Sequence, residues 1–407
     1  MGIACGIDWS ERHHDIALVD HDGNVVAKRR IGTGVEGFAE LLAAVAEHSE
    51  RPEDVAVAIE TDKGVLVAAL QAAGFTVYGI NPRAVARYRE RHGQAGGKSD
   101  PGDAVVLADI LRTDRHRHRT LPELSELAVA VKVLARQHQE AIWARQQTVN
   151  RLRSLLVDFF PNALTTFPVL THRAALAVLA AAPSPAAAAK LTRRRVVTLL
   201  NRCGRGDRPG LADQILRDLR APALRQPPQV EDALALSVLG LVAVIDAMQT
   251  TITQLERALT ETLERHDHAE LLRSAPGIGP ILAGRLLAEI GDDPTRFATA
   301  DGLRAFAGTA PITRASGRSK LVSTRHIRNR RLADACHWWA FATITKSTGA
   351  RAHYDSRRAA GDAHNAALRN LANKLLGRLW WCLVNNQPWD DQAAWPHQPA
   401  DGQHAAA

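Results

Sequence analysis

Five short apolar runs in the first ~115 residues constrain the fold more than any other feature of the chain. The runs span residues 3–9, 15–19, 25–31, 55–59 and 75–80. The second and third are joined by His21-Asp22-Gly23-Asn24, a strong hairpin-turn sequence. Helical patterns follow at residues 38–46, 65–73, from Pro82 and from Asp100 to Leu111. A three-stranded meander followed by helical crossovers predicts one mixed sheet in an α/β domain.

Four carboxylates are expected to meet at one edge of this sheet. Asp8 ends the first strand, Glu60 ends the fourth, and Asp100 and Asp103 share one face at the start of a helix. Clustered carboxylates repel one another unless cations neutralise them. An all-oxygen site suits Mg²⁺ or Mn²⁺, and two such ions activate a nucleophile and stabilise a leaving oxygen in phosphodiester chemistry.

Each of these acids also has a plain structural interpretation. Asp100 suits a helix N-cap, and Asp103 suits the helix dipole. Asp8 alone is also consistent with a turn residue, and Glu60 with a solvated strand end. The metal-site hypothesis rests on all of these positions fitting one sheet topology.

Composition points to a polyanionic partner. Lysine and arginine number 51 against 43 acidic residues, which gives a net charge of +8 and a pI near 9.7.

The cysteines are far apart, at positions 5, 203, 336 and 382, so neither a zinc site nor a disulfide framework is expected. The N-terminus lacks the pattern of a signal peptide. The most apolar stretch, 233–248, is shorter than the ~20 residues of a membrane span. We expect a soluble, cytoplasmic protein with no membrane partner.

Two long helices are expected after the α/β domain, from Pro122 to Phe160 and from Glu231 to Leu272. In the second, Val238, Ile245, Ile252 and Leu259 recur every seven residues, which favours a coiled coil or a helical hairpin. A plain amphipathic core helix remains open. The predicted domains are 1–120, a helical coiled-coil linker at 121–270, a mostly α C-terminal domain at 271–385 and a disordered tail at 386–407.

A basic segment marks the C-terminal domain, because no acidic residue occurs from Gly302 to Ala333. Its guanidinium and ammonium groups suit phosphate. The candidate nucleic-acid-binding residues are Arg314, Arg318, Lys320, Arg325, Arg328, Arg330 and Arg331. Within the segment, Ser316-Gly317 would expose a hydroxyl that flanking arginines could bring to a phosphate, although serine is also common in ordinary turns.

Two glycine-containing segments give weaker evidence for phosphate binding. Residues 275–280 have the outline of a helix-hairpin-helix turn that approaches a phosphate, and an ordinary helical turn is equally consistent. Residues 93–99 imitate a phosphate loop but carry His92 where its first glycine belongs, so a mobile loop is favoured, with Lys98 available to a phosphate.

These motifs, taken together, resemble one protein family. Gly6-Ile7-Asp8-Trp9-Ser10, Ile59-Glu60-Thr61 and Lys98-Ser99-Asp100-Pro101-Gly102-Asp103-Ala104 resemble the RuvC-like domain of the insertion-sequence one-ten transposases, which are related to the Piv/MooV DNA invertases. Pro276-Gly277-Ile278-Gly279, Phe306-Ala307-Gly308 and Ser316-Gly317 resemble the second domain of that family. The resemblance covers about residues 3–385, with the motifs in the family's order.

The resemblance implies a ribonuclease-H-like fold with a DEDD set, here Asp8, Glu60, Asp100 and Asp103, that binds Mg²⁺. It also implies a C-terminal serine nucleophile that becomes linked to DNA, with Ser316 the first candidate and Ser319 the second. Family members are similar in forming dimers that assemble into tetramers. Some are guided by a structured RNA that pairs with donor and target DNA.

One segment departs from the family. Many members read Ser-Lys-Arg-Gly-Asn where this chain has Ile327-Arg328-Asn329-Arg330-Arg331, so the local turn is expected to differ. The leading hypothesis is a transposase that cuts and rejoins DNA strands. The alternatives are a metal-only nuclease of the Holliday-junction-resolvase kind, with water as nucleophile, and a non-catalytic nucleic-acid-binding relic.

Overall fold

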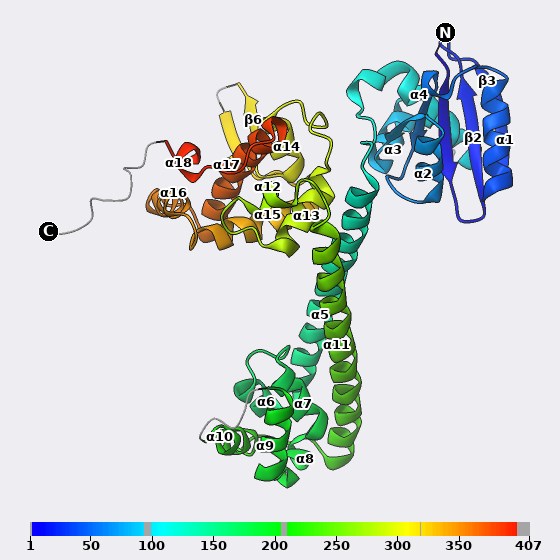
Figure 1. Ribbon diagram of the computed structural model, residues 1–407. Helices are drawn as coiled ribbons and strands as arrows, with labels where there is room; N and C mark the ends of the chain where they lie inside the picture. The colour runs from blue at the N-terminus through cyan, green and yellow to red at the C-terminus, as the bar shows by residue number, and fades with distance from the viewer. Residues whose placement is uncertain (1, 93–98, 205–209, 318, 397–407) are drawn as a thin grey trace. The chain divides into compact units, whose positions relative to one another are not determined.

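The computed structural model describes residues 2–92, 99–204, 210–317 and 319–396 of the 407-residue chain. The chain divides into two compact units, residues 1–123 and 124–407 (Figure 1). The predicted helical linker and the predicted C-terminal domain therefore belong to one unit.

The first unit is built on the predicted mixed sheet. Its strands are β1 (Ala4–Trp9), β2 (His13–Val19), β3 (Val25–Gly32), β4 (Ala56–Ile59) and β5 (Thr76–Gly79). Their order is β3-β2-β1-β4-β5, in which β1 to β3 are antiparallel and β4 and β5 are parallel to β1 (Figure 1). Gly23 has a φ of +94°, which explains why glycine follows Asp22 in the turn between β2 and β3.

Helices cover both faces of this sheet. One core joins Ile7 and Ile59 to α1 (Val35–Ala46) and α2 (Val65–Ala72). A second core, on the other face, contains residues of α3 (Pro82–His92) and α4 (Asp100–Asp114). Short 3₁₀ turns lie at Pro52–Asp54 and Arg115–Arg117.

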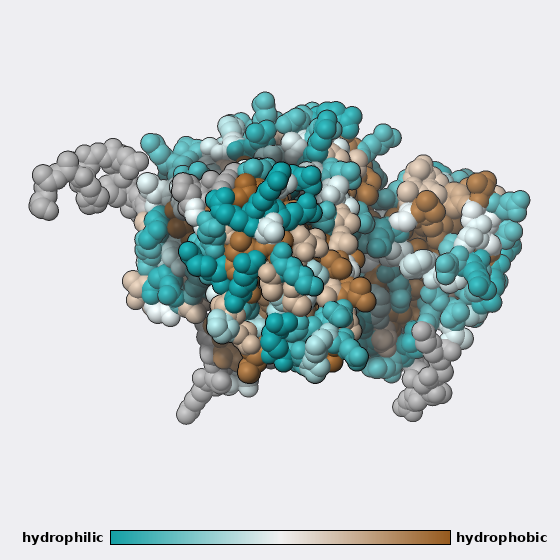
Figure 2. Space-filling model, turned by 90° about the horizontal axis from the view of Figure 1, so that it is seen from below, coloured by the Kyte–Doolittle hydropathy of each residue, from teal (hydrophilic) through white to brown (hydrophobic). Residues whose placement is uncertain are grey.

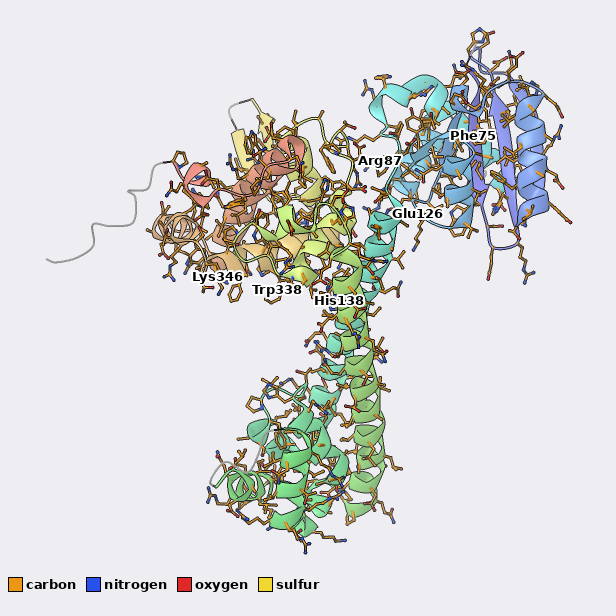
Figure 3. All side chains as sticks on the ribbon, in the orientation of Figure 1. Phe75, Arg87, Glu126, His138, Trp338 and Lys346 are labelled. Carbon is orange, nitrogen blue, oxygen red and sulfur yellow. The ribbon has the colours of Figure 1, made fainter. Side chains whose placement is uncertain are left out.

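Two long helices pack against each other in the second unit. They are α5 (Glu126–Phe159) and α11 (Pro228–Leu263). The four heptad positions Val238, Ile245, Ile252 and Leu259 are all buried. His138 of α5 lies in the same contact, where its Nε2 is 3.2 Å from a carboxylate oxygen of Glu256 (Figure 3). The helical hairpin is therefore present, while supercoiling remains a prediction.

A small helical bundle lies between α5 and α11 in the chain. Among the described residues it consists of α6 (Pro161–Thr166), α7 (Arg173–Ala181), α8 (Pro185–Lys190), α9 (Arg193–Arg202) and α10 (Leu211–Leu219). These helices share one apolar core with Leu152 of α5 and Val242 of α11. The bundle thus closes over one end of the long helices.

The second long helix differs from its prediction in two ways. It ends at Leu263 rather than Leu272, because the chain turns at His266, whose Nε2 lies 3.4 Å from a carboxylate oxygen of Asp292. Among the described residues, α11 is the one helix that is long and apolar enough to cross a bilayer. The expectation that this apolar segment is too short for a membrane span was therefore wrong. Core helices pass the same test, and α11 packs on α5 and α7. The face shown in Figure 2 is largely hydrophilic, with scattered apolar patches.

Where the structure describes it, the C-terminal part is mostly helical and contains one β-hairpin. Its elements are α12 (Ala269–Arg273), α13 (Pro280–Ile290), α14 (Ala300–Ala307), β6 (Ile312–Ser316), β7 (Ser319–Ser323), α15 (Arg330–Thr343), α16 (Thr348–Ala359), α17 (His364–Asn385) and α18 (Asp391–Ala394). They surround a core that includes the fully buried Trp339 and several leucines of α17.

The predicted disordered tail begins too early. Asp391 accepts a hydrogen bond from the Ser347 hydroxyl at 2.8 Å, and Trp395 is buried. A Cβ on Gly349 would lie 2.2 Å from the Trp395 ring, so the indole can pack here only because residue 349 has no side chain. The prediction failed because proline and alanine content concealed the aromatic anchors Trp389 and Trp395. Residues 397–407 lie outside the described part.

Candidate active site

The pairing of β1 with β4 determines where Asp8 lies in the site. Ile7 of β1 is paired in parallel register with Ile59 of β4, so Asp8 and Glu60 each follow a member of the same pair. Ile7 is fully buried on the face that α1 and α2 cover. Side chains alternate along a strand, so Asp8 points to the opposite face, which α3 and α4 cover.

Helix α4 reaches Asp8 because Gly6 leaves room for it. A Cβ on Gly6 would lie 1.9 Å from the carbonyl oxygen of Ala104. Gly6 and Asp8 lie on the same face of β1, so the first turn of α4 comes to the end of this strand. That turn carries Asp100 and Asp103. Ser99 occupies the N-cap position, so capping does not explain Asp100.

The four predicted carboxylates act on one another. The pKa of Asp8 is raised to about 6, first by burial and then by the charges of Asp100, Asp103, Glu60 and Asp15. Asp103 is itself buried, whereas Asp100 is exposed. The structure therefore brings the whole DEDD set within electrostatic reach of Asp8.

A fifth acid, which the sequence analysis did not select, belongs to the same cluster. Asp15 of β2 is paired directly opposite Asp8 in antiparallel register, so both side chains lie on one face. His13 is two residues earlier on that face. Ligand atoms of His13, Asp15 and Asp100 all lie within 4.8 Å of one another. The signal was the alternation His13-x-Asp15 at the start of a strand that pairs with the Asp8 strand.

Two arginines balance part of this negative charge. Arg30 of β3 donates two hydrogen bonds to Asp15, at 3.1 and 2.9 Å. Arg89 of α3 lies 2.5 Å from a carboxylate oxygen of Asp103. Each arginine thus holds one acid at the margin of the cluster, while Asp8 keeps a raised pKa.

The residues present fit a divalent cation. Carboxylate oxygens are the donors that Mg²⁺ and Mn²⁺ prefer. The Nε2 atom of His13 is buried without a hydrogen-bond partner among the described residues, beside Asp15 and Asp100. Burial of Asp8 and the acids around it raise its pKa, and a bound cation would offset both effects. His13 could accordingly provide a nitrogen ligand beside the oxygen set.

Ser316 lies at the tip of the β6–β7 hairpin and is exposed. It is paired across the turn with Ser319. Gly317 has a φ of +56°, a backbone conformation that favours glycine. Thus the hairpin presents Ser316 to solvent, as the sequence predicted for a turn serine. Arg318 and the side chains of Arg314, Ser319 and Lys320 lie outside the described part of the structure, as do residues 93–98 with Lys98.

The remaining basic candidates lie between β7 and the first turn of α15. Arg328 extends across Gly308, where an added Cβ would be 2.2 Å from its Cδ. Arg325 accepts a hydrogen bond from Arg328 through its carbonyl oxygen at 3.2 Å. Arg330 is exposed. Asn329 provides the N-cap of α15, so the segment that departs from the family contains the side-chain cap of this helix.

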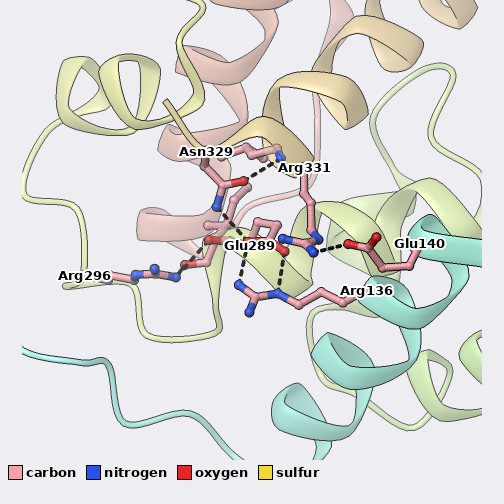
Figure 4. Close-up of polar contacts among 8 residues, drawn as sticks. Arg136, Glu140, Glu289, Arg296, Asn329 and Arg331 are labelled. Carbon is pink, nitrogen blue, oxygen red and sulfur yellow. Dashed lines mark hydrogen bonds and ion pairs between the residues drawn. The ribbon is translucent and has the colours of Figure 1, made fainter. Parts of the chain in front are cut away.

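Arg331 differs from these residues because its side chain contacts α5. Its guanidinium forms an ion pair with Glu140 and lies 5.9 Å from the centre of the Trp143 ring. Nearby, Glu289 of α13 accepts hydrogen bonds from Arg136 at 2.9 and 3.0 Å and from Asn329 at 2.7 Å (Figure 4). These contacts join α5, α13 and the start of α15.

The glycine turn before α13 packs inward rather than outward. The Pro276 carbonyl accepts hydrogen bonds from Trp339 at 3.0 Å and Thr343 at 2.9 Å. A Cβ on Gly277 would lie 2.9 Å from the backbone nitrogen of Thr343. These contacts favour the ordinary-turn interpretation for Pro276 and Gly277, while Gly279 remains exposed.

The three-stranded meander followed by parallel strands, with acids near the end of β1, is the arrangement expected of a ribonuclease-H-like domain. Comparison with known families agrees with this fold class. A family model for the DEDD domain of IS110 elements, described as a transposase, matches residues 5–161. A second model, described as the transposase IS116/IS110/IS902 family, matches residues 269–355.

Whole proteins match as well. The chain is 48% identical over 400 residues to the "Mini-circle putative transposase for IS117" of Streptomyces coelicolor, covering 97% of both chains. It is 30% identical over 387 residues to an IS900 uncharacterized 42 kDa protein of Mycobacterium paratuberculosis, covering 93% of this chain and 94% of the relative. An IS110 uncharacterized 43.6 kDa protein of Streptomyces coelicolor is 33% identical over 292 residues, or 70% of each chain. The chain belongs to the IS110 family of transposases, which catalyse DNA strand transfer.

Proposed function

We propose that this transposase cuts and rejoins DNA with two groups of residues, a cation-binding carboxylate cluster and a serine nucleophile. The observation that carries the proposal is the convergence of acids on Asp8, whose pKa is raised first by burial and then by the charges of Asp100, Asp103, Glu60 and Asp15. Such a cluster is unfavourable unless a cation binds it.

Asp8, Glu60, Asp100 and Asp103 would hold Mg²⁺ or Mn²⁺. When bound, such ions polarise a phosphodiester and stabilise the leaving 3′ oxygen. Asp8 would lie at the centre of the ligand set. Arg89 and Arg30 would hold Asp103 and Asp15 in place from the sides.

Ser316 would supply the nucleophile. Its Oγ–H bond breaks, an Oγ–P bond forms, and the P–O3′ bond breaks with a proton passing to the 3′ oxygen. The product is a phosphoserine link to DNA, which a second strand end reverses by attacking through its own hydroxyl. Exposure at a hairpin tip and the adjacent Gly317 support this role, because DNA can approach the hydroxyl. Ser319 is the alternative nucleophile.

DNA and RNA would contact the basic segment of the C-terminal part. Arg325, Arg328 and Arg330 belong to a stretch free of acidic residues, and such a stretch favours phosphate. A structured guide RNA that pairs with donor and target DNA, together with a dimer or tetramer of this chain, would complete the assembly.

A trapping experiment with labelled DNA tests the proposal. In the presence of Mg²⁺ the wild-type chain should yield a covalent adduct that survives denaturing electrophoresis. Ser316→Ala should abolish the adduct, and Asp8→Asn and Asp103→Asn should abolish it too, whereas Ser323→Ala on the same hairpin should retain it. An adduct in Ser316→Ala would assign the attack to another residue. Cleavage without any adduct in the wild type would favour water as the nucleophile.

A further inference from the structure

A cavity of about 350 Å³ opens in the C-terminal part, and its lining residues belong neither to the carboxylate cluster nor to the β6–β7 hairpin. It is enclosed by α5, the end of α14, the start of α15 and the start of α17. The side chains that give it chemical character are Trp143, Arg328, Arg330, His337, Asn365 and Arg369. None of the functional roles described above uses the cavity as a whole.

The cavity is strongly cationic. It is lined by three arginines, and its carboxylate, Asp334, is already in an ion pair with Arg285. Neither Arg330 nor Arg369 forms an ion pair or a side-chain hydrogen bond among the described residues. Guanidinium groups left without an internal anion favour an external one, and their fork of donors matches phosphate.

The cavity also has an aromatic side. Trp143 of α5 and His337 of α15 line it. Nucleobases stack on such rings whatever their sequence, and single-stranded nucleic acid is held in this way. Asn365 adds an amide that can donate to and accept from a base edge.

Size limits the occupant. Pockets for small ligands have volumes of about 300–1,000 Å³, so this cavity is at the lower end of that range. One nucleotide is of a suitable size, whereas a base pair is too large. Gly308 shapes the wall, because its φ of +73° and missing Cβ let the stem of Arg328 cross it.

We propose that this cavity binds a single unpaired nucleotide, with its base against Trp143 and its phosphate on Arg330 and Arg369. This inference rests on the proposed function, since it assigns one position of the bound nucleic acid to one site. The nucleotide comes from a DNA strand or from RNA, and both share the chemistry that the cavity recognises.

Binding of short oligonucleotides tests the inference without any strand transfer. The probes are 5′-phosphorylated trinucleotides with a central 2-aminopurine, in DNA and RNA forms. A 5′-phosphorylated DNA trinucleotide backbone that is abasic at all three positions and fluorescent at its 3′ end is compared with a base-bearing version carrying the same label. Binding to the full chain is followed by fluorescence in EDTA at constant salt. Trp143→Ala should weaken binding of the base-bearing probes about fivefold to a hundredfold, the range for loss of one base–aromatic stack. It should leave binding of the abasic probe unchanged.

Arg330→Gln and Arg369→Gln should weaken all probes, because phosphate is common to them. Matched controls are Trp338→Ala, an exposed tryptophan of α15 outside the cavity (Figure 3), and Arg273→Gln, an exposed arginine of α12. Both controls should bind as the wild type does. Because Trp143 also contacts Arg331, Trp143→Phe and thermal melting check that the fold is retained.

Equal binding of the base-bearing probes by Trp143→Ala and the wild type would overturn the inference. Equal affinity for abasic and base-bearing probes would do the same. Preference for the DNA or the RNA probe identifies the source of the nucleotide. The covalent-adduct experiment is independent, so a wild type that forms the adduct but ignores trinucleotides rejects the cavity assignment alone.

Discussion

At the scale of single residues, the main feature of the candidate active site is a set of carboxylates that repel one another and are held close together by the fold. Asp8 carries the effect most clearly, since burial and four neighbouring acids raise its pKa to about 6. A raised pKa means that the folded chain binds a proton more tightly than the unfolded chain does. The folded state therefore loses stability as pH rises from the unfolded pKa near 4 to about 6.

Asp8→Asn should stabilise the cation-free protein at pH 8 and leave its stability nearly unchanged at pH 4. The reason is that the wild-type carboxylate costs stability only once it is ionised in the folded state. Melting temperatures in EDTA across this pH range measure the effect. Adding Mg²⁺ should raise the melting temperature of the wild type more than that of the variant. A stability difference that does not change with pH would contradict the raised pKa.

Arg89→Gln should strengthen Mg²⁺ binding. Arg89 is a fixed positive charge on Asp103, and its removal takes away repulsion toward an incoming cation. A gain of about two- to tenfold in affinity is expected for a partly exposed charge. Calorimetric titration with Mg²⁺ measures it. Arg87→Gln, an exposed arginine of the same helix (Figure 3), is the control and should bind as the wild type does. Weaker binding by Arg89→Gln would mean that the arginine chiefly positions Asp103.

At the scale of elements, the site depends on close approach between a strand and a helix. α4 crosses β1 at Gly6, where no side chain fits. The same helix carries Asp100 and Asp103 in its first turn. The distance between β1 and α4 therefore sets where Asp100 and Asp103 lie relative to Asp8.

Gly6→Ala should both destabilise the first unit and weaken cation binding. An added methyl group would overlap the Ala104 carbonyl, and overpacking of this kind costs about 1–3 kcal/mol. Denaturant unfolding and Mg²⁺ titration measure the two effects. Gly2→Ala, at a glycine with open space around it, is the control. If the variant unfolds like the wild type and binds Mg²⁺ equally well, α4 can move without disturbing the site.

Glu289→Gln should loosen the junction of α5, α13 and α15. Glu289 is buried and accepts two hydrogen bonds from Arg136, so the change removes the carboxylate charge that faces a largely buried guanidinium. Removing one partner of a buried pair costs about 3 kcal/mol. Denaturant unfolding measures the loss. Glu261→Gln, in an exposed pair with Arg257, should cost less than about 1 kcal/mol. Similar values for both variants would show that the pair at Glu289 is solvated.

At the scale of the whole molecule, the acids and the serine belong to different compact units. Asp8 lies in residues 1–123 and Ser316 in residues 124–407. The 34-residue α5 begins just after this division and is about 50 Å long. Because the acids and the serine lie in different units, one chain can supply the acids while a partner supplies the serine.

A mixture of Asp8→Ala and Ser316→Ala chains should recover part of the recombination that neither has alone. In a mixed oligomer, an intact cluster from one chain can serve an intact serine from another. Recombination of a labelled DNA substrate measures the recovery. Each variant alone is the control, and mixed oligomers are verified by pull-down of a tagged chain. No recovery in verified mixed oligomers would mean that each site is completed within one chain.

The sequence alone determined the strand order, the mixed sheet and the long helices, because these depend on local periodicity and on turn residues such as Gly23. It also selected Asp8, Glu60, Asp100 and Asp103, since parallel strands end at a common edge. Asp15 escaped prediction from the sequence, because the alternation His13-x-Asp15 becomes informative only once the register that pairs Asp15 with Asp8 is known. The anchoring of Trp395 at Gly349 and the cavity around Trp143 likewise escaped it. Those features join residues far apart in the chain, and only tertiary packing decides which distant surfaces meet.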